Sequence, residues 1–149
     1  MRVLLQIVDN ASVTIDEKLY SSINKGYLLY IGFTEGDDLQ TLEKMCKKIK
    51  KLRVFPDASG KTNLSITDVG GEVLSVSQFT LYANAKEGNR PSFVKAMPYK
   101  DADKMFALWN NLLVSEFKSV KTGVFGADMK IESINDGPFT LWLDSKEIF

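Results

Sequence analysis

Polar and apolar residues alternate in several short runs of the chain and recur every three or four residues in two longer ones. Alternation with a period of two is typical of a strand that has one buried and one exposed face. It predicts strands over residues 1–8, 11–15, 27–33, 53–55, 64–66, 73–82, 131–135 and 139–144. Asp9-Asn10 separates the first two runs and is a turn signal, so these two strands are expected to form an antiparallel hairpin.

Two stretches have the period of an amphipathic helix. The first follows the capping residues Asp37 and Asp38 and runs to about Leu52, with one apolar stripe made of Leu39, Leu42, Met45, Cys46, Ile49 and Leu52. The opposite face is either an ordinary solvated face or a contact for phosphates, and it carries Lys44, Lys47, Lys48, Lys50 and Lys51. The second helix is expected over residues 101–117, where bulky apolar residues recur at helical spacing.

The predicted strands outnumber the predicted helices. The chain has no internal repeat, linker or low-complexity stretch, so residues 1–149 are expected to form one domain. The opening hairpin must be antiparallel, whereas the connections that contain helices permit parallel neighbours. We therefore predict an α/β fold, with mixed and mostly antiparallel sheets in a barrel-like, layered β/β/α arrangement. Both long helices should pack against one side of it.

The amino-acid composition excludes several classes of catalytic and metal site. The chain has no histidine and one cysteine, which excludes histidine-based triads and zinc sites, intrachain disulfides and cysteine-rich metal sites. No metal and no cofactor is therefore expected. Cys46 lies on the apolar stripe and is interpreted as a core residue.

The net charge and the hydropathy limit the classes of partner that this protein can bind. Lysine plus arginine and aspartate plus glutamate both number 19, and this zero net charge argues against coating of long nucleic acids but allows contact with a nucleic acid end. No apolar run approaches about 20 residues and no signal-peptide pattern follows Met1. We therefore expect a cytoplasmic protein with no membrane partner.

One polar box, Ser77-Gln78-Phe79-Thr80, lies within the predicted strand 73–82. A strand interior is a costly place for two hydroxyls and an amide unless they have partners or a task. The hydroxyls either pair across a sheet or serve a site. A second stretch, 135–140, contains the turn Asp136-Gly137-Pro138 and is interpreted as the counterpart of the box in one active site.

Four motifs follow one another in a recognisable order: Ser77-Gln78-Phe79-Thr80, Gly88-Asn89-Arg90-Pro91-Ser92-Phe93, the stretch 121–129 and Asn135-Asp136-Gly137-Pro138. Together with the opening Met1-Arg2-Val3 and Ala11-Ser12-Val13, they resemble the D-aminoacyl-tRNA deacylase family, also called D-tyrosyl-tRNA deacylase, over essentially the whole chain. The resemblance implies hydrolysis of the ester that joins a D-amino acid to the terminal ribose of tRNA. It also implies removal of glycine mischarged on alanine tRNA.

The resemblance further implies a homodimer that works without a metal and binds the 3′ end of tRNA. In this family a cis Gly-Pro peptide enters the active site of the partner subunit and excludes L-amino acids. Carried over to this chain, that peptide is Gly137-Pro138, although a Gly-Pro turn is most often trans.

An aminoacyl ester is already activated, so a site needs an oxyanion donor, a positioned water or hydroxyl and a grip on the terminal adenosine. Backbone N–H groups around Phe79 and Thr80 are candidates for the donor, and the catalytic set is taken as Ser77, Gln78, Phe79 and Thr80. No histidine is present to activate Thr80, so we favour the 2′-hydroxyl of the tRNA, which the family is thought to use, with Gln78 and Thr80 as positioning groups.

The substrate-binding residues are less sharply indicated. Phe125, Ala127 and Met129 are candidates to line the adenosine pocket, and their other interpretation is as core residues. Lys86 and Arg90 are either phosphate contacts or ordinary loop charges. Two other functions stay open: a generic esterase with Thr80 as a covalent nucleophile, and a non-enzymatic module that binds RNA ends.

Overall fold

The structure is a computed structural model, and it describes residues 1–149. The main sheet contains the strands β1 (Arg2–Ile15), β2 (Lys18–Ile23), β3 (Gly26–Gly32), β6 (Glu72–Ser77), β7 (Val120–Thr122) and β8 (Lys130–Asp144). A second sheet pairs β4 (Arg53–Pro56) with β5 (Thr62–Ser65). The helices are α1 (Leu39–Lys51), α2 (Tyr99–Glu116) and the short α3 (Ser145–Ile148).

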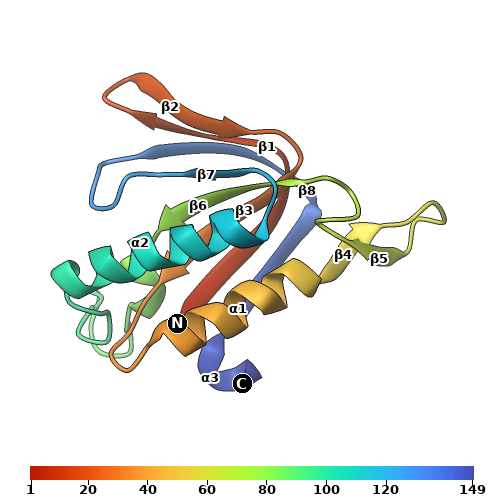
Figure 1. The fold of residues 1–149 in the computed structure, drawn as a ribbon. Helices are drawn as coiled ribbons and strands as arrows, with labels where there is room; N and C mark the ends of the chain where they lie inside the picture. The colour runs from red at the N-terminus through yellow and green to blue at the C-terminus, as the bar shows by residue number, and fades with distance from the viewer.

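The main sheet is mixed, as predicted. Strand β1 pairs antiparallel with β2, β3 and β8, whereas β3 with β6 and β6 with β7 are parallel. The sheet curls until the edge strands β2 and β7 approach each other, where the Ser21 hydroxyl donates to the Thr122 carbonyl at 3.0 Å (Figure 1). This contact nearly closes a barrel, whose interior is filled by Val8, Ala11, Val13, Ile23, Leu28, Leu74 and Val76.

Both long helices lie side by side against one face of the sheet, as expected (Figure 1). They enclose with it a larger core of 22 buried residues, in which Trp109, Tyr27 and Phe55 are the largest fully buried side chains. Cys46 belongs to this core, and burial raises the pKa of its thiol to about 12. The thiol therefore stays protonated at neutral pH, and the interpretation of Cys46 as a core residue is confirmed.

The predicted hairpin turn at Asp9-Asn10 is wrong. Strand β1 continues through these residues, which form an irregularity in its pairing with β8. The chain reverses instead at Asp16 and Glu17, whose φ angles of 49° and 61° are those of a two-residue hairpin turn. This turn lacks the usual glycine or asparagine, so it carries a weak sequence signal, and β2 was missed with it.

The last two predicted strands are one strand. Strand β8 runs from Lys130 to Asp144 along β1, with Val8 opposite Asn135 and Gln6 opposite Thr140. Residues 136–139 have no partner in this register, so they leave the sheet as a bulge where a turn was predicted. The short edge strand β7 was also missed, because three residues are too few to show a period.

Candidate active site

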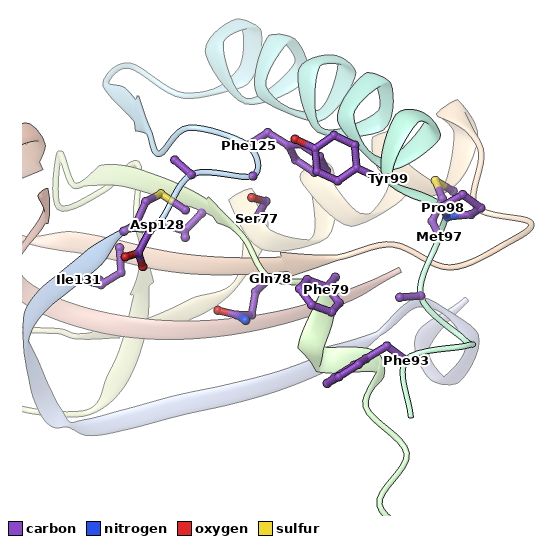
Figure 2. A pocket seen from close by; sticks show the side chains of 15 residues that line it. Ser77, Gln78, Phe79, Phe93, Met97, Pro98, Tyr99, Phe125, Asp128 and Ile131 are labelled. Carbon is purple, nitrogen blue, oxygen red and sulfur yellow. The ribbon is translucent and has the colours of Figure 1, made fainter. Parts of the chain in front are cut away.

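A cavity of about 650 Å³ opens where the end of β6, the first turn of α2 and the start of β8 meet (Figure 2). Its walls are built from residues 76–79, 93, 96–99, 125–129 and 131. The polar box and the stretch 121–129 thus contribute to one hollow, although about 50 residues separate them in sequence. Ser77, Gln78 and Phe79 line it together with Phe125, Ala127 and Met129, whereas Thr80 lies outside the lining.

The polar box does not lie inside a strand, which corrects the prediction for 73–82. Strand β6 ends at Ser77, which pairs with Ile31, one residue before β3 itself ends at Gly32. The Gln78 amide makes the last backbone hydrogen bond to β3, donating to the Ile31 carbonyl at 2.7 Å. The chain then forms a 3₁₀ helix, η1 (Phe79–Tyr82).

The start of η1 leaves two amides without an acceptor in the helix. Its first internal hydrogen bond runs from the Leu81 amide to the Gln78 carbonyl at 3.3 Å, so the Phe79 and Thr80 amides precede it. Neither residue is buried, and Phe79 borders the cavity. The Gln78 side-chain amide donates to the Thr80 hydroxyl at 2.5 Å, which fixes both polar side chains beside these donors. Such an arrangement can hold a developing oxyanion.

Two aromatic pairs lie at the cavity, Tyr99 with Phe125 on the side of α2 and Phe79 with Phe93 on the side of η1, where Gln78 lies next to Phe79 (Figure 2). Tyr99 and Phe125 meet edge to face with ring centroids 5.0 Å apart, and Phe79 and Phe93 do so at 5.0 Å. Aromatic side chains of this kind are stacking surfaces for a nucleic acid base. Tyr99 was missed by the sequence analysis and Phe93 was noted only within the motif 88–93, because their place at the cavity depends on where the chain between η1 and α2 returns.

The glycines of the stretch 121–129 allow a close backbone approach, as the sequence indicated. Gly126 has a φ of 74°, and a Cβ there would lie 2.3 Å from the Tyr99 hydroxyl. Any larger residue would therefore displace Tyr99 or the segment itself. A Cβ at Gly123 would lie 2.6 Å from the Met129 sulfur. The segment is thus held against the first turn of α2, which forms one wall of the cavity.

The second predicted motif, 135–138, lies apart from this cavity. The Gly137–Pro138 peptide is cis, both residues are exposed, and neither lines the cavity of its own chain. The Asn135 side chain closes the base of the bulge, because it accepts from the Phe139 amide at 3.0 Å and donates to the Thr140 hydroxyl at 3.0 Å. One chain therefore presents the bulge outward from the sheet.

The fold contains no cluster of three metal-ligating side chains and no membrane-spanning helix. No three side chains of aspartate, glutamate or cysteine converge in a way that could hold a metal ion. No helix is both long enough and apolar enough to cross a bilayer.

Comparison with known proteins identifies the family. The family described as D-Tyr-tRNA(Tyr) deacylase matches residues 4–144 of the chain. This chain belongs to the D-Tyr-tRNA(Tyr) deacylase family. A D-aminoacyl-tRNA deacylase of Lactobacillus acidophilus is 53% identical over 144 residues, covering 97% of this chain and 99% of the relative. One of Thermomicrobium roseum is 50% identical over 148 residues, covering 99% and 96%.

Solved structures agree with the deacylase fold. A protein named c-Myc DNA Unwinding Element Binding Protein is 38% identical and superimposes with a TM-score of 0.92, covering 97% of this chain and 98% of that one. A probable eukaryotic D-amino acid tRNA deacylase has a TM-score of 0.84 at 15% identity, covering 95% and 97%, which shows the common fold alone.

Two further residues were not singled out from the sequence, one that lines the cavity and one that contacts η1. Asp128 is the only charged side chain that lines the cavity, although the motif around it was noticed. Arg2 is far from the motifs in sequence, but its guanidinium donates to the Leu81 carbonyl of η1 at 2.9 Å and to the Asp144 carboxylate at 2.8 Å. It lies over the rings of Tyr82 and Trp142, 4.5 and 5.3 Å from their centroids.

Arg2 therefore ties η1 to the end of β8. Burial alone would raise the pKa of Asp144, but its bonds from Arg2 and from the Lys146 amide, with the charge of Arg2, hold that pKa below its usual range. The carboxylate thus stays ionised at neutral pH and keeps its bond to Arg2. Because Arg2 is bonded to the last part of η1, it is placed to hold the free amides at the start of that helix.

We expect Arg2→Ala to lower kcat of the deacylase by up to about 100-fold with little change in KM, because small displacements of a positioned group are costly. Arg2→Lys keeps the charge but not the planar fork, so it should give an intermediate kcat. Steady-state kinetics on D-tyrosyl-tRNA, with thermal melting as a check on folding, would measure this. Equal kcat in all three proteins would show that Arg2 only stabilises the fold.

Proposed function

We propose that this chain hydrolyses the ester that joins a D-amino acid to the terminal ribose of tRNA, and that it acts in the cytoplasm as one domain of 149 residues. Membership of the deacylase family supports this reaction. The observation that carries the assignment to a site is the pair of free amides at Phe79 and Thr80, next to a cavity with aromatic walls.

In the proposed reaction the ester carbonyl oxygen lies against the Phe79 and Thr80 amides, which stabilise the negative charge that develops on it. Water adds to the carbonyl carbon, the ester C–O bond breaks, and the ribose oxygen takes a proton. Gln78 and Thr80, already bonded to each other, position the reacting groups. The chain has no histidine to serve as a base, and this absence supports a role for the 2′-hydroxyl of the tRNA in activating the attack.

The terminal adenosine would occupy the cavity. Its base would stack on the aromatic wall of Tyr99 and Phe125, with Ala127 and Met129 as apolar neighbours. Asp128 would face the polar edge of the nucleoside, where its carboxylate can accept hydrogen bonds from amino or hydroxyl groups. This placement leaves the aminoacyl group on the side of the cavity nearest η1.

Chiral proofreading would come from Gly137 and Pro138 of a second copy of the chain. This proposal is supported by their exposure and by their absence from the cavity of their own chain. In a symmetric dimer the same surfaces meet twice, so each bulge would reach the cavity of the other subunit. A wall of backbone rejects an L side chain but has nothing to reject in glycine, so glycine mischarged on alanine tRNA would also be a substrate.

Deacylation of D- and L-tyrosyl-tRNA by wild type and by Thr80→Ala tests this function. We expect hydrolysis of the D form only, and Thr80→Ala should lower the rate without abolishing it, because it loses the positioning hydroxyl but keeps the backbone amide. Similar rates on both enantiomers would refute the proofreading function. A trapped acyl-enzyme on Thr80, with full activity on small esters, would identify a generic esterase. Binding of charged tRNA without any hydrolysis would identify an RNA-binding module.

A further inference from the structure

The basic residues of the chain are concentrated in one short segment. Residues 44–53 contain no acidic residue but six of the 19 cations, namely Lys44, Lys47, Lys48, Lys50, Lys51 and Arg53, which we call the basic face. The rest of the chain has 13 cations and 19 acidic residues, a net charge of −6. A neutral protein divided in this way has a strong dipole, which turns the basic face toward a polyanion as the two approach.

Most of the basic face is free to bind an anion. Its four exposed lysines on α1 take part in no ion pair, and the half-buried Lys50 alone has a carboxylate partner, Glu116, at 2.9 Å. Four of the six cations, Lys47, Lys50, Lys51 and Arg53, line an open groove of about 600 Å³. Ser65, Thr67 and the carboxylates of Asp68 and Glu116 complete its lining, so four cations outnumber two carboxylates there. The Ser65 hydroxyl already donates to Asp68 at 2.7 Å. An open polar groove with an excess of lysine and arginine is typical of a surface that binds phosphate oxygens.

Stability of α1 does not account for this arrangement. Lysines in the last turn of a helix interact favourably with its dipole, which explains Lys48, Lys50 and Lys51. Lys44 and Lys47 lie before that turn, and Arg53 lies beyond the helix on β4. A solvated helix face usually mixes both signs of charge. The one acidic residue of α1, Glu43, makes no ion pair with its lysines.

We propose that the basic face binds the phosphate backbone of the tRNA acceptor stem while the 3′ end lies in the cavity. The inference rests on the proposed function, since it assigns a docking surface to the same substrate. Double-stranded RNA is recognised largely through its shape and its backbone, and lysines serve as point charges for phosphate. The basic face would therefore add affinity for any tRNA, independently of its sequence and of its amino acid.

Helix α2 sets the distance between the two contacts. Its first residue, Tyr99, lines the cavity, and Glu116 at its other end is bonded to Lys50. With 18 residues, α2 separates the basic face from the cavity by roughly 25 Å along its axis. A small ester in the cavity does not reach the basic face over this distance, whereas the stem of a tRNA can extend along the layer of the two helices (Figure 1).

The test compares Lys47→Glu/Lys51→Glu with Lys18→Glu/Lys121→Glu, which changes the net charge equally but on the exposed edge strands β2 and β7. Fluorescence anisotropy gives the Kd of an uncharged tyrosine tRNA for each protein as a function of salt. Hydrolysis of the D-tyrosyl ester of adenosine is measured in parallel. Lys47→Gln/Lys51→Gln serves as a second variant, which avoids acidic residues at the end of a helix.

We expect the Lys47→Glu/Lys51→Glu variant to bind tRNA at least about tenfold more weakly, with a salt dependence of log Kd that is shallower by about two. The Gln variant should show a smaller change in the same direction, the edge-strand variant almost none, and hydrolysis of the adenosine ester should be unchanged in all. Equal tRNA affinity in the basic-face and edge-strand variants would overturn the inference. If the wild-type protein bound tRNA but did not hydrolyse the D-tyrosyl ester, the proposed function would be wrong instead.

Discussion

Replacing Phe79 by proline should reduce kcat for D-tyrosyl-tRNA by roughly 10²–10³, the cost of losing one oxyanion donor in other enzymes. Proline has no backbone N–H, so the substitution removes one of the two free amides at the start of η1 without touching the hydroxyl of Thr80. The loss should appear in kcat, because the amide acts on charge that exists only in the transition state. Single-turnover hydrolysis at saturating enzyme measures this step directly.

Position 79 is suited to this substitution. Phe79 is the first residue of η1, a helix position that proline favours, and its amide has no partner in the helix to lose. The preceding residue, Gln78, has φ −149° and ψ 83°, which is outside the helical region that proline disfavours in its neighbour. The backbone should therefore keep its course, and the melting temperature should change little.

Phe79→Ala is the matched control, because it also loses the ring but keeps the amide. The Phe79 ring packs against Phe93 at the border of the cavity, so its removal should weaken binding and raise KM in both variants. Only the proline variant should also lose kcat. If the alanine and proline variants had the same kcat, the oxyanion would have to be stabilised elsewhere in the site.

The sequence predicted those features of this site that depend on residues close together in the chain. The absence of histidine and the polar box 77–80 directed attention to backbone donors, and residues 125–129 of the second motif line the same cavity as residues 77–79. The end of β6 was not predictable, because it depends on where β3 stops pairing, at a residue more than 40 positions earlier. The free amides exist only because the strand ends there.

Long-range contacts account for the other misses. Arg2 reads as an ordinary charge in a strand, and its role emerges only because β1 passes both Leu81 and Asp144. The turn at Asp16-Glu17 and the continuity of β8 depend on pairing with β1 and not on a local turn signal. The sequence predicted that the lysines of α1 share one face, but it did not predict the groove that three of them line with Arg53, because Arg53 lies on β4.

Mixed dimers of Phe79→Pro and Pro138→Ala chains should hydrolyse D-tyrosyl-tRNA but not L-tyrosyl-tRNA, if the bulge acts on the other subunit. Proline restricts the backbone, and Gly137 has a φ of 127° that other residues avoid, so the conformation of this segment is restricted. Loosening it with Pro138→Ala should raise the rate on the L form relative to the D form by about 10- to 100-fold in the homodimer.

The mixed dimer separates the two halves of the site. The cavity with both amides belongs to the Pro138→Ala chain and would receive the intact bulge of the Phe79→Pro chain, so its selectivity for the D form should return. The other cavity combines both defects and should contribute almost nothing. Heterodimers purified through two different tags would therefore show about half the wild-type rate on the D form, and wild-type discrimination against the L form.

A bulge that acted within its own chain would give a different result. The active cavity would then keep its own altered bulge, and the heterodimer would hydrolyse L-tyrosyl-tRNA at about half the rate of the Pro138→Ala homodimer. A chain that stays monomeric would refute the shared site outright. The two homodimers are the controls, because each contains one of the two substitutions that the heterodimer combines. The rate on the L form therefore decides whether residues 137–138 complete a cavity that one chain leaves open.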